Sequence, residues 1–254
     1  MLGSTSLIPI HDENPTRTFS ILTAVLIGIN VFVFFFLQPG ASRGIDCQTA
    51  QFLYKWGVVP QEISDNVVLT GEVPGGPGCR LLPKSIHVSL ISSMFLHGDL
   101  LHLGGNMLFL WVFGNNIEDT LGKIKYMLFY LVTGLAASFA HILTNADSVV
   151  PTIGASGAVS GLLGAYLILF PKARIKAILP LFIIWQIVRL PATVVLGVWF
   201  VSQFLIGAGQ QAGGGGVAWM AHVGGFVAGM LLILVMGGRK KVRQQQVPTP
   251  VTYS

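Results

Sequence analysis

Charged residues are scarce in this sequence. Only 10% of its 254 residues are Asp, Glu, Lys or Arg, whereas 52% are hydrophobic; soluble domains carry about 25% charged residues. So few charges cannot cover a surface that faces water, which excludes an ordinary soluble domain. The hydrophobic residues also form long continuous runs, the pattern of membrane-spanning helices. We therefore expect an all-α membrane protein.

Cysteine is almost absent as well. The sequence has only Cys47 and Cys79, and both lie between the first and second apolar runs. In an oxidising compartment they could form one disulfide, and two unpaired thiols fit the sequence equally well. The net charge of +5 does not indicate a nucleic acid partner, because Lys and Arg collect in the cytoplasmic loops of membrane proteins.

Six apolar stretches approach the roughly 20 residues that cross a bilayer. They comprise residues 19–37, 90–113, 126–143, 153–170, 193–206 and 217–236. Pro180, Arg189 and Pro191 interrupt the run ahead of the fifth stretch, so residues 175–191 should lie at the membrane interface. Residues 1–17 are polar and lack the short apolar core of a cleavable signal peptide. The first stretch should therefore remain as a span.

Basic residues indicate the orientation of these spans. With the N-terminus in the cytoplasm, the inner segments carry eleven of the 15 Lys and Arg residues, and the first outer loop carries the other four. This predicts a multi-pass protein with both ends inside. Its parts are a cytoplasmic segment at 1–18, a six-span domain at 19–237 with a long structured external loop at about 38–89, and a basic and polar cytoplasmic tail at 238–254.

Strongly polar residues inside spans are costly and usually functional. Here they form three sets, which are His97, His102 and Asn106 in the second span, Ser156 and Ser160 in the fourth, and His222 in the sixth. These three spans run in one direction across the membrane, and each set lies near the outer end of its span. The sets should therefore converge on one layer just below the outer surface.

Two faces of small residues would bring the fourth and sixth spans together. At helical spacing, these faces consist of Ser156, Ser160 and Gly164 in one span and of His222, Gly225 and Gly229 in the other. Packing of the two faces predicts that the Ser156 hydroxyl contacts the His222 ring.

A serine in contact with a histidine suggests nucleophilic catalysis. A serine hydroxyl is a weak nucleophile until a base takes its proton, and histidine can do so near neutral pH. His102 and Asn106 lie one turn apart and can both donate to an oxyanion, as can the Ser156 amide at the start of its helix. Because no buried carboxylate is placed to orient His222, we predict a Ser–His dyad and not a triad.

Other roles fit these residues when each is taken singly. A serine in a transmembrane helix commonly packs there and bonds its own backbone, which is the role we expect for Ser160. An intramembrane histidine can relay protons or bind a metal, as in a small transporter or channel. However, the five-residue spacing of His97 and His102 turns them to different helix faces, and no inverted repeat supports a transporter.

Three motifs together resemble the rhomboid intramembrane serine proteases. They are His-Leu-Gly-Gly-Asn at 102–106, Gly-Ala-Ser-Gly at 154–157, and Ala-His-Val-Gly-Gly at 221–225 followed by Gly229. The resemblance implies an intramembrane serine endopeptidase that needs no metal or cofactor and cleaves in or beside the transmembrane segment of a membrane-protein substrate. It implies a small residue before the cut and helix-weakening residues nearby. Residues 8–16 and 189–192 look like those of bacterial members, which implies a bacterial plasma membrane.

The resemblance also implies roles for individual residues. Ser156 would be the nucleophile and His222 the general base, with His102, Asn106 and the backbone of Gly154 at the oxyanion site. Close helix packing is the role that we expect for Gly157, Gly161, Gly164, Gly225 and Gly229. The alternative is a non-catalytic relative that binds or escorts transmembrane helices, but such relatives typically lack the serine or the histidine.

Two positions depart from common family patterns. Some members have an aromatic residue one turn after the nucleophile, beneath the histidine ring, where this chain has Ser160. Many have a Trp-Arg pair near the end of the first external loop, where this chain has Val88 and Ser89. The support of His222 and the anchoring of the external loop should therefore differ from those members.

Overall fold

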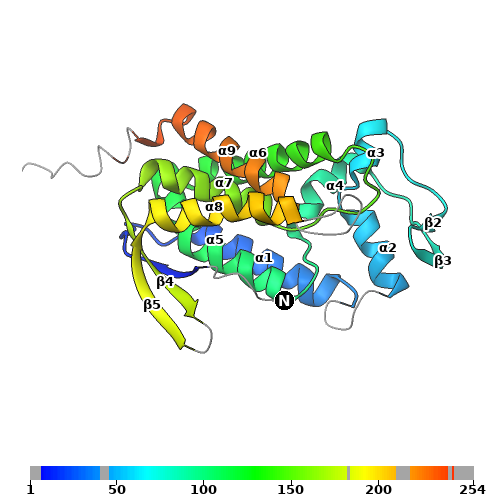
Figure 1. Ribbon diagram of the computed structural model, residues 1–254. Helices are drawn as coiled ribbons and strands as arrows, with labels where there is room; N and C mark the ends of the chain where they lie inside the picture. Colours follow the sequence, from blue (N-terminus) through cyan, green and yellow to red (C-terminus); the bar gives the residue numbers. More distant parts are fainter. Residues whose placement is uncertain (1–6, 41–45, 182–183, 210–217, 240–241, 243–254) are drawn as a thin grey trace, which may run out of the picture.

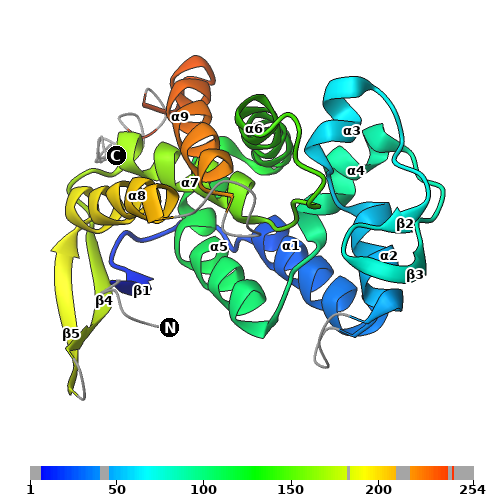
Figure 2. The same ribbon diagram turned by 45° about the vertical axis from the view of Figure 1, so that its right-hand side comes forward.

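The computed structural model describes residues 7–40, 46–181, 184–209, 218–239 and 242. Within these residues, six longer helices pack together and form the body of the protein (Figure 1). They are α1 (Ile21–Phe32, continued by the π-helix η1, Val33–Leu37), α5 (Leu100–Leu121), α6 (Lys123–Thr144), α7 (Ser156–Leu169), α8 (Ala192–Gly209) and α9 (Trp219–Val235). Most of α7 is buried, and it packs against α5, α6, α8 and α9 (Figure 2). The helix that carries the predicted nucleophile is therefore the central one.

By its own length and composition, α6 is the one described helix that is long and apolar enough to cross a membrane. The helices α7, α8 and α9, and α1 together with η1, are apolar but shorter. The helical character that the sequence predicts is thus observed, while the count of six spans stays a prediction.

The second predicted span, at 90–113, is wrong in its boundaries. Its first residues belong to α4 (Ile86–Ser92) and to the 3-10 helix η2 (Ser93–Phe95), and α5 starts only at Leu100. The break occurs because the Asp99 side chain accepts a hydrogen bond from the His102 amide at 2.8 Å, which caps a new helix start. At its other end α5 runs on to Leu121, and Gly122 with φ 76° ends it.

The interfacial segment predicted at 175–191 is a β-hairpin. Strands β4 (Arg174–Leu181) and β5 (Ile184–Pro191) pair antiparallel, and β1 (Ile8–Asp12) joins β4 on its other side. Ile175 and Ala177 are fully buried whereas Lys176 between them is not. This alternation with period two is typical of a strand, and run length alone does not detect it.

The N-terminal segment is docked onto the C-terminal ends of α5 and α7. One carboxylate oxygen of Asp12 accepts hydrogen bonds from Asn116 Nδ2 at 2.6 Å and from the Tyr166 hydroxyl at 2.9 Å. The Glu118 carboxylate accepts from the amides of Leu22 and Thr23 at the start of α1. These bonds let α5 extend through its polar C-terminal residues, because the buried side chains of Asn116 and Glu118 have hydrogen-bond partners there.

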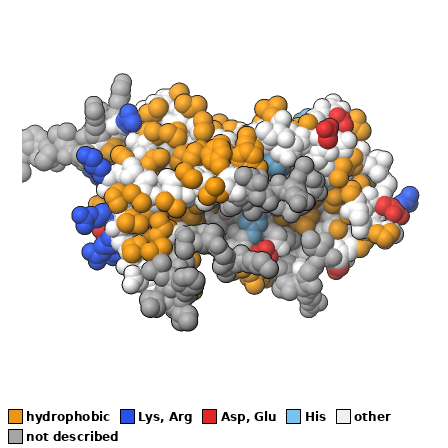
Figure 3. Space-filling model, viewed as in Figure 1, with side chains coloured by type: hydrophobic (Ala, Val, Ile, Leu, Met, Phe, Trp, Pro, Cys, Tyr) orange, Lys and Arg blue, Asp and Glu red, His pale blue; other side chains and the backbone are white. Residues whose placement is uncertain are grey.

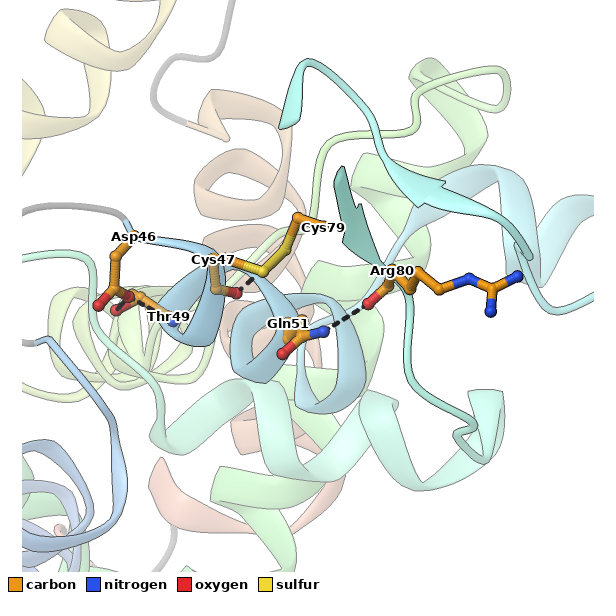
Figure 4. The surroundings of a disulfide bond; sticks show 6 residues. All are labelled: Asp46, Cys47, Thr49, Gln51, Cys79 and Arg80. Carbon is orange, nitrogen blue, oxygen red and sulfur yellow. Dashed lines mark hydrogen bonds between the residues drawn. A yellow bond between two sulfur atoms is a disulfide. The ribbon is translucent and has the colours of Figure 1, made fainter. Parts of the chain in front are cut away.

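The predicted external loop at about 38–89 is folded in its described part. It contains α2 (Cys47–Trp56), α3 (Pro60–Asp65) and the paired strands β2 (Glu72–Val73) and β3 (Gly76–Arg80). Of the two possibilities for the cysteines, the disulfide is the one observed, and Cys47–Cys79 ties α2 to β3 (Figure 4). A disulfide suits an oxidising compartment, in agreement with an external position.

A buried ion pair adds a second tie within this loop. Lys84 Nζ lies 2.5 Å from Glu62 Oε2, and both side chains are 3% exposed. The same ammonium donates to the carbonyl oxygens of Tyr54 and Gly57. Burial lowers the pKa of Lys84 below its ordinary value, and the Glu62 carboxylate opposes that shift. The pair therefore joins α2, α3 and the chain that leads into α4.

Basic side chains gather at the opposite end of the molecule from this loop. Figure 3 shows most of the visible Lys and Arg on the side of the β4–β5 hairpin. Lys172, Arg174 and Arg189 are exposed there. This is the end that the positive-inside rule assigns to the cytoplasm.

Candidate active site

Ser156 is the first residue of α7, and the chain before it is held in place by the loop at 38–89. Thr152 and Val58 exchange two backbone hydrogen bonds, of 2.6 and 3.1 Å. Gly154 has φ +126°, a conformation that side chains disfavour. A Cβ at Gly154 would also lie 2.8 Å from His102 Nε2. Residue 154 must therefore be a glycine, because a side chain there would disfavour the backbone conformation and collide with His102.

Close contact between α7 and α9 is made by the predicted glycines. A Cβ added to Gly225 would collide with the Gly157 carbonyl, and one added to Gly229 would collide with the Gly161 carbonyl. At Gly164, likewise, a Cβ would collide with the carbonyl of Phe226 in α9. All five predicted glycines lie at close helix contacts. Gly164, Gly225 and Gly229 meet the backbone of the facing helix, whereas a Cβ at Gly157 or Gly161 would collide with Ala137 or Thr133 of α6.

This packing brings the predicted pair together. Ser156 Oγ lies 2.9 Å from His222 Nε2, within hydrogen-bonding distance. Both side chains line a cavity of about 1100 Å³, together with His102 and Asn106 of α5. The convergence that the sequence predicts is therefore observed, although α5 begins later than expected.

The α5 side of the cavity offers hydrogen-bond donors. His102 Nδ1 accepts from the Gly98 amide at 3.4 Å, so the proton of the neutral ring lies on Nε2, the nitrogen that faces Gly154. Asn106 Nδ2 is buried and has no hydrogen-bond partner among the described residues. The amide of Ser156 is in the first turn of α7, so it has no acceptor within the helix. The three residues that carry these donors all line the same cavity.

Gly154 does not supply a fourth donor, and this corrects the prediction for its backbone amide. The Gly154 N–H donates to the Ser93 carbonyl oxygen at 2.8 Å. It is therefore occupied, and Gly154 contributes space and backbone geometry instead.

His97 contacts His102, contrary to the expectation from helical spacing. The two rings meet edge to face with centroids 5.0 Å apart. The five-residue spacing does not separate them because His97 precedes α5 and is not on the helix. Within the part of the chain that the structure describes, no group of three His, Cys, Asp or Glu residues is arranged to hold a metal ion.

Helix α8 supplies two contacts to His222 that sequence reasoning missed. Gln203 Oε1 lies 2.7 Å from His222 Nδ1, and the Trp199 ring lies against the imidazole with centroids 6.0 Å apart. Ser160, where an aromatic support was considered, instead donates to the Ser156 carbonyl oxygen at 2.6 Å, which is the packing role expected for it. A signal for Gln203 was present, since it is a polar residue inside the predicted span at 193–206.

Comparison with known proteins places this site in a family. The family model described as "Rhomboid domain" matches residues 86–239. "Rhomboid protein 1, mitochondrial" of Saccharomyces cerevisiae is 34% identical over 153 residues, which are 57% of this chain and 40% of that protein. "RHOMBOID-like protein 5" of Arabidopsis thaliana is 36% identical over 112 residues, 42% of this chain and 36% of that protein.

A human relative, "Presenilin-associated rhomboid-like protein, mitochondrial", is 33% identical over 96 residues, 37% of this chain and 25% of that protein. The chain thus spans two fifths or less of the length of these relatives. All three are eukaryotic, so they lend no support to the expectation of a bacterial plasma membrane. The matched domain covers more than half of the chain and includes the cavity residues from His102 to His222. The chain therefore belongs to the rhomboid family and, like other members, is an integral membrane protein.

Proposed function

We propose that this protein is an intramembrane serine endopeptidase that hydrolyses peptide bonds in or beside the transmembrane segments of other membrane proteins. The observation that carries the proposal is the 2.9 Å contact of Ser156 Oγ with His222 Nε2 in a cavity that also holds unpaired donors. A nucleophile in contact with a base, beside oxyanion donors, is the arrangement that acyl transfer requires.

In the proposed reaction, His222 Nε2 takes the proton of Ser156 as Oγ attacks the scissile carbonyl carbon. The carbonyl oxygen becomes an oxyanion that accepts hydrogen bonds from His102 Nε2, Asn106 Nδ2 and the Ser156 amide. The protonated imidazole then gives its proton to the departing amine, and the peptide C–N bond breaks. Water, deprotonated by His222, hydrolyses the acyl-enzyme and restores the Ser156 hydroxyl. No metal or cofactor takes part.

The substrate must leave its helix before it can react. A peptide bond inside a helix is hydrogen-bonded and enclosed by side chains, so the serine cannot reach its carbonyl carbon. This favours substrates with helix-weakening residues near the cut, and the resemblance to rhomboid proteases implies a small residue before it. We further propose six spans with both termini on the cytoplasmic side, where the basic residues gather, and the cavity nearer the outer surface.

Labelling with a serine-reactive fluorophosphonate tests the nucleophile directly. We expect the detergent-solubilised full chain to be labelled on Ser156, because its hydroxyl contacts a base, and we expect Ser156→Ala to lose the label. Ser160→Ala is the matched control: its hydroxyl faces a backbone carbonyl, so labelling should persist. Attachment to another serine, or labelling that survives Ser156→Ala, would contradict the proposal. An escort protein predicts no labelling at all.

Asn106→Leu separates transition-state stabilisation from substrate binding. The substitution keeps the side-chain size and removes one donor to the oxyanion, so kcat should fall by about 10²- to 10³-fold with little change in KM. The measurement is the cleavage rate of a reconstituted single-span substrate over a range of substrate concentrations. Asn115→Leu, on the same helix outside the cavity, should keep the wild-type kcat. A raised KM at unchanged kcat would assign Asn106 to substrate binding instead.

A further inference from the structure

We infer that Gln203 is a positioning residue, which holds His222 in the tautomer and orientation that a general base needs. The inference rests on the proposed function and extends it to α8. Gln203 Oε1 lies 2.7 Å from His222 Nδ1, on the side of the ring opposite to the nitrogen that contacts Ser156. Gln203 is only 4% exposed, so water does not compete freely for this bond.

The direction of the Gln203 amide is fixed by its own helix. Its nitrogen donates to the Trp199 carbonyl oxygen and to Ser202 Oγ, both at 3.1 Å. The Ser202 hydroxyl is in turn committed, since it donates to the same carbonyl at 2.6 Å. A carbonyl can only accept, so the NH₂ group must face the helix backbone. The amide oxygen is therefore the atom that faces His222.

This orientation selects the tautomer of His222. An amide oxygen carries no hydrogen, so His222 Nδ1 must donate to it. A neutral imidazole with its proton on Nδ1 has a lone pair on Nε2, the atom 2.9 Å from Ser156 Oγ. If the amide were reversed, the proton would move to Nε2, and the ring could no longer accept the serine proton. Gln203 thus performs part of the role that a carboxylate has in a triad.

Trp199 completes the support from α8. It lies one helical turn before Gln203, its ring contacts His222, and it also packs on Phe226 of α9 with centroids 6.0 Å apart. One face of α8 therefore gives the imidazole both a hydrogen bond and an aromatic wall. This replaces the aromatic residue that some rhomboids carry on α7, at the position occupied here by Ser160.

Three variants of the full chain test the role of Gln203 in a reconstituted cleavage assay. Gln203→Met keeps the side-chain length and removes the acceptor, so kcat should fall by about 10- to 100-fold, with KM changed less than threefold. Gln203→Glu keeps an acceptor and should retain cleavage. Gln186→Met makes the same change at an exposed position of β5 and should match the wild type.

Gln203→Glu should also shift the pH profile of kcat/KM, which would stay unchanged if Gln203 had only a structural role. A carboxylate beside Nδ1 favours the protonated ring, and the base must be neutral, so the acid limb of the kcat/KM profile should shift to higher pH. The other ionisable groups around the cavity are Asp99, which caps α5, His102 of α5, His141 of α6 and Asp147 of the α6–α7 loop. They are the same in wild type and variant, so the difference between the two profiles reports on residue 203.

Nitrogen-15 NMR of histidine-labelled protein reads the tautomer without turnover. The His222 signals, identified by their loss in His222→Ala, should show the proton on Nδ1 in the wild type. A proton on Nε2 would overturn the inference, as would Gln203→Met with wild-type kcat or Gln203→Glu with an unshifted acid limb. If the wild type neither cleaves nor is labelled, the proposed function fails, whereas the NMR result still decides whether Gln203 sets the tautomer.

Discussion

Replacing Ser156 by alanine is expected to lower kcat for cleavage of a reconstituted single-span substrate by about 10⁴- to 10⁶-fold. In the proposed reaction the hydroxyl is the attacking group, and among the described residues it is the one side-chain atom hydrogen-bonded to His222 Nε2. Alanine removes one oxygen atom from a site that packing already defines, so the variant should fold normally. Its thermal unfolding in detergent should match that of the wild type.

His222→Ala should cost about as much as Ser156→Ala, and the double variant no more than either one. The serine and the histidine act as a unit, so loss of one leaves the other without a function. The matched control is His87→Ala, because His87 is exposed on α4 and does not line the cavity. Additive losses in the double variant, or cleavage by Ser156→Ala above about one hundredth of the wild-type rate, would contradict the dyad.

The same variants distinguish the competing functions. A helix-binding escort predicts that the wild type does not cleave and that Ser156→Ala still binds its client. A transporter or channel predicts a flux that survives Ser156→Ala. A protease predicts that cleavage disappears while substrate binding remains, because the cavity walls are unchanged.

The contact of Ser156 with His222 could be predicted from sequence because its geometry depends on helical spacing and on the direction of each span. Helical spacing fixes which residues share a face, and span direction fixes the depth of Ser156 and His222. Gln203 could not be placed in this way, because its contact depends on the rotation of α8 about its own axis. That rotation is set by the packing of Trp199 on Phe226 and Phe109, which no single stretch of sequence specifies.

A long-range hydrogen bond, a helix cap and a strand alternation account for the other differences. The amide of Gly154 is occupied by Ser93, a residue 61 positions earlier, so no local pattern reveals the bond. The start of α5 is set by Asp99, whose capping role is recognisable in sequence. The apolar residues at 90–96 and from Leu100 onward nevertheless read as one continuous span, so the break between them is not predicted. The β4–β5 hairpin follows an alternation that an apolar-run criterion ignores.

Gly229→Ala is expected to damage both stability and activity, because it separates α7 from α9. The added Cβ would lie 2.6 Å from the Cα of Gly161 and closer still to its carbonyl oxygen. Backbone atoms cannot rotate away as a flexible side chain can, so the helices must move apart. We expect a loss of about 1–3 kcal/mol in the free energy of unfolding, which in a chain of this size is on the order of 2–10 °C in Tm.

The loss of activity should exceed what the lost stability explains. Gly229 lies two turns after His222 on the same face of α9, so any widening there alters the 2.9 Å contact of His222 with Ser156. A displacement of about 1 Å can lower a rate about 10²-fold. The measurements are thermal unfolding in detergent and kcat at a temperature where both proteins stay folded.

Gly197→Ala in α8 is the matched control for Gly229→Ala. A Cβ there would have no atom within 4 Å, and alanine is the better helix former by about 0.5–1 kcal/mol. This variant should therefore be as stable as the wild type or more so, with full activity. If Gly229→Ala behaved like Gly197→Ala, the backbone contact of α7 and α9 could not be what holds Ser156 against His222. The base would then have to be positioned from α8 alone, through Gln203 and Trp199.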